Sequence, residues 1–314
     1  MEQRKLIQHG NSSLTIALPL KWLKQRNLKK GDSLNIEEEG NKLILGTEKG
    51  FESDKISIDV SKLDRTSLLL YIQSLYRFGY NEIEVKFDNP LTKHYRKNEV
   101  VSISSVIHSI VARCIGFEII KQTKDEITIK YLTKESKEDF KIILRRIFLL
   151  VNDISENLIQ GIKNQDLDLV AAVEQQHDNI NNFTNYCLRL LNKYGHPDVK
   201  QTCFYYHIIA SLDKIVDILK YNARDILNYK KKLNKDTIII LEQINKSIEG
   251  YYDLFYKFNL VTVDKLSENR DLVKNMFKDK LKTLPNEEII YLTKMIQILE
   301  IILDLTDSRL GLEY

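Results

Sequence analysis

The segment from residue 134 to residue 314 contains six long amphipathic stretches that are separated by short breakers. Apolar residues recur every three or four positions in each stretch, which is the period of a helix with one buried face. The breakers include Gly195-His196-Pro197 and Pro285, and both glycine and proline end helices. We expect helices over residues 136–163, 166–194, 198–229, 235–258, 262–281 and 286–311. The sequence therefore predicts an all-helical C-terminal region.

The last three of these stretches look like a degenerate copy of the first three. The third begins after Pro197 and carries an acidic pair that starts at Asp213, and the sixth begins after Pro285 and carries one that starts at Glu300. The first carboxylate follows its proline by sixteen positions in one stretch and by fifteen in the other. An internal repeat of this length predicts two three-helix bundles within residues 134–314.

Residues 1–50 follow a different period. Apolar and polar residues alternate in short runs, and the runs are separated by the turn pairs Gly10-Asn11, Gly31-Asp32 and Gly40-Asn41. This pattern predicts short hairpins, with one short helix after Pro19. A segment of this size cannot bury an adequate core alone. Two copies that interleave their hairpins about a two-fold axis could do so, and we therefore expect a homodimer.

Positive charge is concentrated in residues 1–30. The whole chain has a formal net charge of +3. The first thirty residues contain seven cations against Glu2 alone, namely Arg4, Lys5, Lys21, Lys24, Arg26, Lys29 and Lys30. The remainder is about neutral or slightly acidic, so a polyanionic partner is expected at the N-terminal segment.

The order and spacing of the turn, proline and helix residues within residues 1–50 resemble those of the swapped-hairpin domain of the AbrB, SpoVT and MazE antitoxin family. The matching residues are Arg4-Lys5, Gly10-Asn11-Ser12-Ser13, Ala17-Leu18-Pro19, Trp22-Leu23 and the run from Leu28 to Ile36. The resemblance implies a homodimer whose paired N-terminal strands lie against DNA. Arg4 and Lys5 would contact a groove, and Ser12 and Ser13 would contact phosphates. Lys21, Lys24, Arg26, Lys29 and Lys30 would neutralise further phosphates. The alternative is that these cations are a solvated face of a dimerisation module.

Residues 51–132 mix both periods. Strand-like runs alternate with two helical stretches in the order β-α-β-α-β-β, which predicts a small two-layer α+β sandwich. The run Lys93-His94-Tyr95-Arg96-Lys97 mixes basic and aromatic residues. A solvated loop is the favoured interpretation of that run, and contact with nucleic acid or an anion is the alternative. The predicted fold class is thus multidomain α+β, with boundaries at 1–50, 51–132 and 134–314.

Two of the predicted helices carry paired carboxylates. Glu174 and Asp178 are four positions apart, as are Asp213 and Asp217, so each pair lies on one helix face. If the two helices face each other, four carboxylates converge and need a cation or protons to offset their repulsion. His177 is expected to point about 100° away from Asp178 and to be a surface or interface histidine. The alternative for each pair is a solvated acidic stripe.

The helical region resembles PhoU-type proteins. The run Leu212-Asp213-Lys214-Ile215-Val216-Asp217, followed by Ala223, matches a motif of that family, and Glu300 with Asp304 matches it in the second half. The resemblance implies two three-helix bundles that bind metal clusters, with Fe, Zn, Mg or Mn as the candidate metals. The candidate ligands are Glu174, Asp178, Asp213, Asp217, Glu300 and Asp304. Two departures weaken the match, since Val216 replaces the family's glycine, and Ser267 with Asp271 replaces the first acidic pair.

An AbrB-like segment joined to a PhoU-like region resembles archaeal phosphate-uptake regulators. We therefore expect a dimeric DNA-binding transcriptional regulator that is linked to phosphate or metal status. The rival prediction is an accessory protein that docks on the ATPase of a phosphate transporter or on another signalling protein, without sequence-specific DNA binding. An enzyme is not expected, because no Ser-His-Asp order, Walker-type loop or fitting G-x-G-x-x-G occurs.

A cytoplasmic location without membrane insertion is expected. The most apolar stretch, Ile142–Val151, is interrupted by two arginines and is too short to span a bilayer. The three cysteines are far apart and form no C-x-x-C pair, which is typical of reduced thiols.

Overall fold

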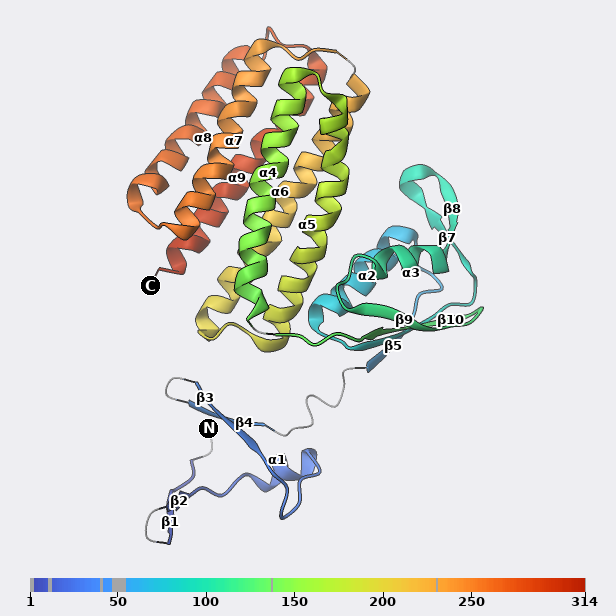
Figure 1. Ribbon diagram of the computed structural model, residues 1–314, viewed down its shortest axis with the longest axis vertical. Helices are drawn as coiled ribbons and strands as arrows, with labels where there is room; N and C mark the ends of the chain where they lie inside the picture. Colours follow the sequence, from blue (N-terminus) through green and yellow to red (C-terminus); the bar gives the residue numbers. More distant parts are fainter. Residues whose placement is uncertain are drawn as a thin grey trace. The chain divides into compact units, whose positions relative to one another are not determined.

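The computed structural model describes residues 3–10, 13–39, 42–46, 55–136, 138–229 and 231–313. The chain divides into two compact units, Met1–Glu52 and Ser53–Tyr314. Each unit is described by itself below (Figure 1).

The first unit consists of two hairpins and one short helix. Strand β1 (Ile7–His9) pairs antiparallel with β2 (Ser13–Thr15), and β3 (Asn35–Glu39) pairs antiparallel with β4 (Lys42–Gly46). Helix α1 (Leu20–Gln25) begins directly after Pro19, whose fixed φ suits a helix start. The corner that precedes β3 is closed by the Asp32 carboxylate, which accepts a hydrogen bond from the Lys29 backbone N–H at 2.7 Å. The predicted hairpins and helix are therefore formed.

The second unit begins with a four-stranded sheet that carries two helices on one face (Figure 1). The sheet order is β5 (Lys55–Asp59), β6 (Glu82–Lys86), β10 (Glu126–Tyr131) and β9 (Phe117–Gln122). Strands β5 and β6 are parallel because α2 (Arg65–Phe78) forms the crossover between them. Helix α3 (Ile103–Val111) precedes β9. Ile83, Ile127 and Ile129 are fully buried in this layer.

An additional hairpin interrupts the predicted order of this α+β segment. Strand β7 (Leu91–His94) pairs antiparallel with β8 (Glu99–Ser102), and the short 3-10 helix η1 (Tyr95–Lys97) joins them. The expected loop at residues 93–97 is therefore the end of a strand and a tight turn. The prediction missed this hairpin because its strands are short and largely exposed, so they lack a buried alternating face.

Six helices follow, and the described ranges confirm the predicted helical region. They are α4 (Asp139–Asn164), α5 (Leu167–Tyr194), α6 (Thr202–Tyr229), α7 (Lys235–Tyr256), α8 (Leu260–Lys280) and α9 (Asn286–Gly311), with a 3-10 turn η2 (Val199–Gln201) before α6. The predicted start of the third stretch, residue 198, directly precedes η2, so α6 itself begins about a turn later than expected.

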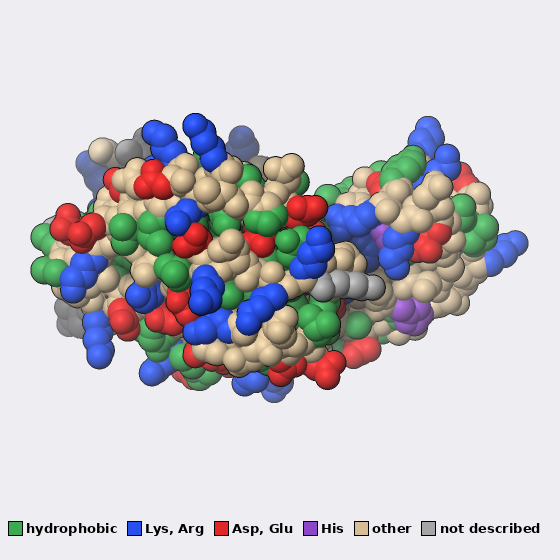
Figure 2. Space-filling view, turned by 90° about the horizontal axis from the view of Figure 1, so that it is seen from above, with side chains coloured by type: hydrophobic (Ala, Val, Ile, Leu, Met, Phe, Trp, Pro, Cys, Tyr) green, Lys and Arg blue, Asp and Glu red, His purple; other side chains and the backbone are tan. Residues whose placement is uncertain are grey.

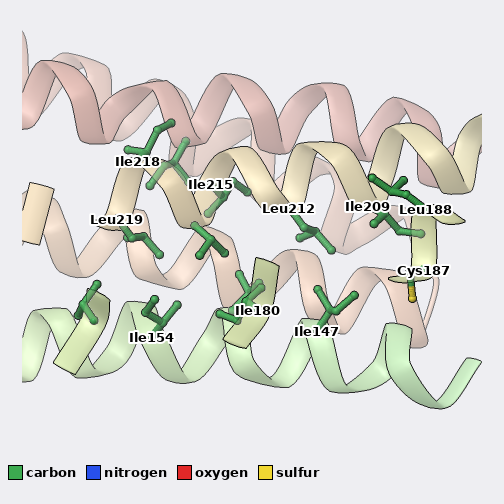
Figure 3. Close-up of a cluster of buried hydrophobic side chains, with 14 of the residues drawn as sticks. Ile147, Ile154, Ile180, Cys187, Leu188, Ile209, Leu212, Ile215, Ile218 and Leu219 are labelled. Carbon is green, nitrogen blue, oxygen red and sulfur yellow. The ribbon is translucent and has the colours of Figure 1, made fainter. Parts of the chain in front are cut away.

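The contacts of the six helices fall both within and between the two predicted groups of three. Helices α4, α5 and α6 contact one another, as do α7, α8 and α9. The contacts between the groups join α4 to α7 and α6 to α9, so helices in equivalent positions of the repeat meet each other. Apolar side chains from α4, α5 and α6 fill the first group, including Ile147, Ile180 and Leu212 (Figure 3). In the described part of the chain, none of these helices has an apolar run long enough to cross a membrane.

Candidate functional site

All seven cations of residues 1–30 are exposed. Arg4 and Lys5 precede β1, Lys21 and Lys24 lie on α1, and Arg26, Lys29 and Lys30 follow α1. The Ser13 hydroxyl donates a hydrogen bond to the His9 carbonyl within the β1–β2 hairpin. The Ser13 hydroxyl is therefore already used as a donor within its own hairpin. Ser12 lies outside the described residues.

The same unit exposes its large apolar side chains. None of its described side chains is buried. Seven leucines and isoleucines each expose more than half of their surface: Leu6, Ile7, Leu14, Ile16, Leu20, Ile36 and Leu43. An apolar surface of this kind on a small unit is typical of a protein contact rather than of a finished fold.

The carboxylates predicted on α5 and α6 do approach one another, and His177 lies between two of them. The His177 side chain is buried, its Nδ1 lies 3.0 Å from Asp178 Oδ1, and its Nε2 lies 3.0 Å from Asp217 Oδ1. His177 is therefore not a surface histidine, and the expectation that it points away from Asp178 was wrong. The helical angle of 100° describes Cβ directions, whereas the imidazole ring is long enough to turn back toward the next residue.

Lys220 completes this cluster from the next turn of α6. Its Nζ donates to Asp217 Oδ1 at 2.6 Å and lies 2.8 Å from His177 Nε2. Burial by itself raises the pKa of Asp217, but hydrogen bonds from His177 and Lys220 outweigh it and hold that pKa well below its usual range. Asp217 is therefore an ionised acceptor whose charge is offset by side chains of α5 and α6.

Asp213 faces the α+β segment. Arg77 of α2 approaches Asp213 Oδ2 at 3.5 Å and donates to Asn185 Oδ1 at 2.7 Å. Asn181 donates to Asp213 Oδ1 at 3.1 Å. Burial raises the pKa of Asp213, and the nearby charge of Asp217 raises it further, whereas Arg77 opposes the change. Arg77 thus supplies positive charge to this carboxylate from a different layer of the unit.

The remaining pair is also compensated by arginines. Arg113, which follows α3, donates to Asp178 Oδ2 at 2.9 Å. Arg224 of α6 binds both oxygens of Glu174, with an Nε–Oε2 distance of 2.7 Å. Each of the four predicted ligands of the first bundle therefore has a basic side chain beside it. Within the described ranges, no group of three or more His, Cys, Asp or Glu side chains is arranged to hold a metal ion.

The second acidic pair has a similar but more exposed environment. Arg270 of α8 donates to both oxygens of Glu300 at 3.0 Å, and Lys274 Nζ lies 2.7 Å from Oε1. These hydrogen bonds lower the pKa of Glu300 to about 2. Asp304 is exposed. Because protein cations lie beside Glu300 and beside the four carboxylates of α5 and α6, these five donors do not fit a metal cluster as they are arranged. The metal site stays a prediction.

Sequence reasoning missed the cations that meet these carboxylates, and it missed Arg189. The Arg189 side chain is fully buried and donates to the carbonyl oxygens of Tyr76 at 3.0 Å and Tyr80 at 2.7 Å. It also pairs with Glu135, which precedes α4. A signal was present, since His177, Asn181, Asn185 and Arg189 recur every four residues along α5. This period marks a continuous polar seam on one helix face.

Neither a protein-family model nor a curated protein sequence matches the chain.

Proposed function

We propose that the protein is a DNA-binding transcriptional regulator that acts as a homodimer through its N-terminal unit. In this proposal the unit is a swapped-hairpin module, and the helical region is a PhoU-like pair of three-helix bundles that responds to phosphate or metal status. The observation that carries the proposal is the joint exposure of seven cations and seven large apolar side chains on the described part of one small unit.

The apolar side chains support the dimer. Leu6, Ile7, Leu14 and Ile36 flank or belong to three of the four strands of the unit and are largely exposed in a single chain. Covering a large aliphatic side chain contributes about 1.5–3 kcal/mol. A second copy presents the same side chains about a two-fold axis, so a single association covers each of these side chains in both copies. The partner best suited to this surface is therefore another copy of the unit.

The cations support a nucleic acid partner. Each of them is exposed, and the only acidic residue among the first thirty is Glu2. In a two-fold dimer the excess charge is doubled, and it becomes a basic surface suited to the phosphate backbone. Arg4 and Lys5 stand next to β1, at the position where the family resemblance implies groove contacts.

The double variant Arg4→Ala with Lys5→Ala tests the proposal. Dimer mass should be unchanged, while DNA affinity and the slope of log affinity against log salt should both fall. The slope should fall by about 0.9 for each phosphate that the variant no longer neutralises. A matched control is Lys124→Ala with Lys130→Ala, which removes the same charge from exposed positions of the α+β segment. If the two double variants bind DNA like the wild type, Arg4 and Lys5 do not bind it.

The rival function, an accessory protein of a phosphate transporter or of another signalling protein, gives a different result. The N-terminal unit would then serve only to join two chains. DNA binding would be weak and indiscriminate, and Arg4 and Lys5 would be replaceable without loss of partner binding.

A further inference from the structure

Five basic side chains meet where the α+β segment approaches α5 and α6. Figure 2 shows Lys and Arg side chains gathered at this junction. They come from the start of α2, the turn of the β7–β8 hairpin, the residues after α3, and α6: Arg65, Arg96, Arg113, Lys220 and Arg224. Arg96, Lys220 and Arg224 lie around the ring of Tyr221, and Arg113 reaches Asp178 of α5. Arg65 is close enough to Arg113 and Arg96 for their charges to act on it.

Tyr221 of α6 holds three of these cations around its ring. Arg96 Nη1 lies 3.2 Å from the Tyr221 hydroxyl, and its guanidinium carbon lies 5.4 Å from the ring centre. Lys220 Nζ lies 4.6 Å and the Arg224 guanidinium carbon 5.5 Å from the same centre. These are distances at which an aromatic ring attracts a cation. The hairpin turn is therefore fixed against α6 with its positive charge directed to the junction.

The cations differ in how they are compensated. Lys220 pairs with Asp217, Arg224 with Glu174, and Arg113 with Asp178. Within the described residues, neither Arg65 nor Arg96 forms an ion pair with a carboxylate, although Asp64 lies next to Arg65 in the chain. Burial lowers the pKa of Arg65, and the charges of Arg113 and Arg96 lower it further, against Asp64. Neighbouring guanidinium groups that repel one another are stabilised when an anion enters between them.

We propose that Arg65, Arg96 and Arg113 form a binding site for a small tetrahedral oxyanion, such as inorganic phosphate or the phosphoryl group of a small metabolite. The planar guanidinium fork matches two oxygens of such a group, which a single ammonium cannot do. We rest this inference on the proposed response to phosphate status; the site lies in the second unit, so it does not depend on DNA binding by the first.

Calorimetric titration of inorganic phosphate into the full chain, in a buffer free of phosphate and sulfate, tests the proposal. The variants are Arg65→Gln and Arg96→Gln, and the control is Lys124→Gln, which removes one charge from the exposed turn between β9 and β10. We expect saturable binding of one phosphate per chain. Each arginine variant should weaken it about tenfold or more, because each removes charge-assisted hydrogen bonds, and the control should leave it unchanged. Sulfate should compete and chloride should not.

Two further arms make the result decisive. Circular dichroism and a melting curve establish that each variant is folded, and Arg96 lies in an exposed turn, so its variant remains informative if Arg65→Gln unfolds. Glycerol 3-phosphate, titrated in parallel, separates a phosphorylated metabolite from free phosphate by which of the two binds more tightly. The proposal is overturned if phosphate gives no saturable binding at millimolar concentration, or if both arginine variants retain wild-type affinity. It is likewise overturned if the variants lose DNA binding while phosphate does not bind, since the cluster is then a nucleic acid contact.

Discussion

The two units of the chain bury their apolar side chains to opposite degrees. In the N-terminal unit, Leu14 and Ile36 each expose 63% of their surface, and none of the described side chains is buried. In the second unit, Ile147 and Ile180 are completely buried among three helices. A short segment of strands has too little interior to stabilise itself, whereas the helical region carries its own core. The difference supports the proposal that the first unit associates with a second copy, whereas the second unit already buries a core of its own.

Replacing Arg189 should cause the largest loss of unfolding free energy, and this loss should be confined to the second unit. Arg189→Met leaves Glu135 buried without its arginine and removes two hydrogen bonds to carbonyl oxygens of the α2 end. Breaking a buried pair in this way costs about 3–5 kcal/mol. Unfolding by urea, followed by helical circular dichroism, measures the change. Arg224→Met is the matched control, because its ion pair with Glu174 is exposed and should contribute about 1 kcal/mol or less. Equal losses of unfolding free energy in the two variants would show that the buried Arg189–Glu135 pair contributes no more than the exposed Arg224–Glu174 pair.

Replacing Leu14 should affect association and leave the stability of the second unit unchanged. Leu14→Glu places a charge in the surface that we expect a second copy to cover. Two copies each lose about 1.5–3 kcal/mol, so the dissociation constant of the dimer should rise at least about a hundredfold. Analytical ultracentrifugation over a concentration series measures it. Leu70→Glu, at an exposed leucine of α2, serves as the control. A wild type that is monomeric at all concentrations would contradict the comparison of the two units.

Acid should weaken the second unit through Asp217. The folded pKa of Asp217 lies below its unfolded value of about 3.9, so its stabilisation is present above that value and is lost as the pH falls toward the folded pKa. Asp217→Asn should lower the free energy of unfolding at pH 7 by on the order of 1 kcal/mol and flatten its dependence on pH below about 4. Asp304→Asn, at an exposed carboxylate, should change neither. Urea midpoints measured from pH 7 to pH 3 provide the comparison, and parallel curves for wild type and Asp217→Asn would exclude this role.

Metal content should give the smallest signal. Because Arg77, Arg113, His177 and Lys220 already compensate the carboxylates of α5 and α6, we expect less than one bound metal ion per chain after purification under metal-replete, reducing conditions. Elemental analysis of the wild type and of Asp213→Ala with Asp217→Ala should agree within error. Stoichiometric metal in the wild type that disappears in the double variant would confirm the metal-cluster prediction.

The two halves of the helical region differ in the polar side chains that line the equivalent faces of α5 and α8. When α8 is aligned on α5, Arg270, Lys274 and Lys278 take the places of His177, Asn181 and Asn185. Helix α5 is covered by α2, so its polar seam is largely buried, whereas the basic row on α8 is half-buried or exposed. A covered face needs matched donors and acceptors, and an exposed one can remain charged.

Much of the fold was predictable because it rests on local periodicity. The six helices follow from the spacing of apolar residues and from breakers such as Pro197 and Pro285, and the corner at Gly31 follows from its glycine. The predicted turn at Gly40-Asn41 lies outside the described residues. The β7–β8 hairpin was not predicted, since exposed short strands leave little pattern. Local signals are strong where one face of an element is buried.

The candidate sites were predictable only in part. The acidic pairs are visible as spacings of four, and the structure does bring Asp178 and Asp217 to a common neighbour. Their compensation depends on Arg77 and Arg113, which arrive from other layers through packing that no local pattern encodes. The cluster around Tyr221 arises in the same way. In both cases the chemistry is fixed by contacts between segments that are distant in the sequence.

The central claim is that the N-terminal unit binds specific DNA as a dimer. The most direct test is binding of the purified full chain to labelled fragments of its own promoter and of phosphate-transport promoters, titrated across salt with competitor DNA. We expect tight binding to a few fragments, with a preference of about 10³-fold or more over competitor. Weak binding to all fragments that disappears at moderate salt would contradict it.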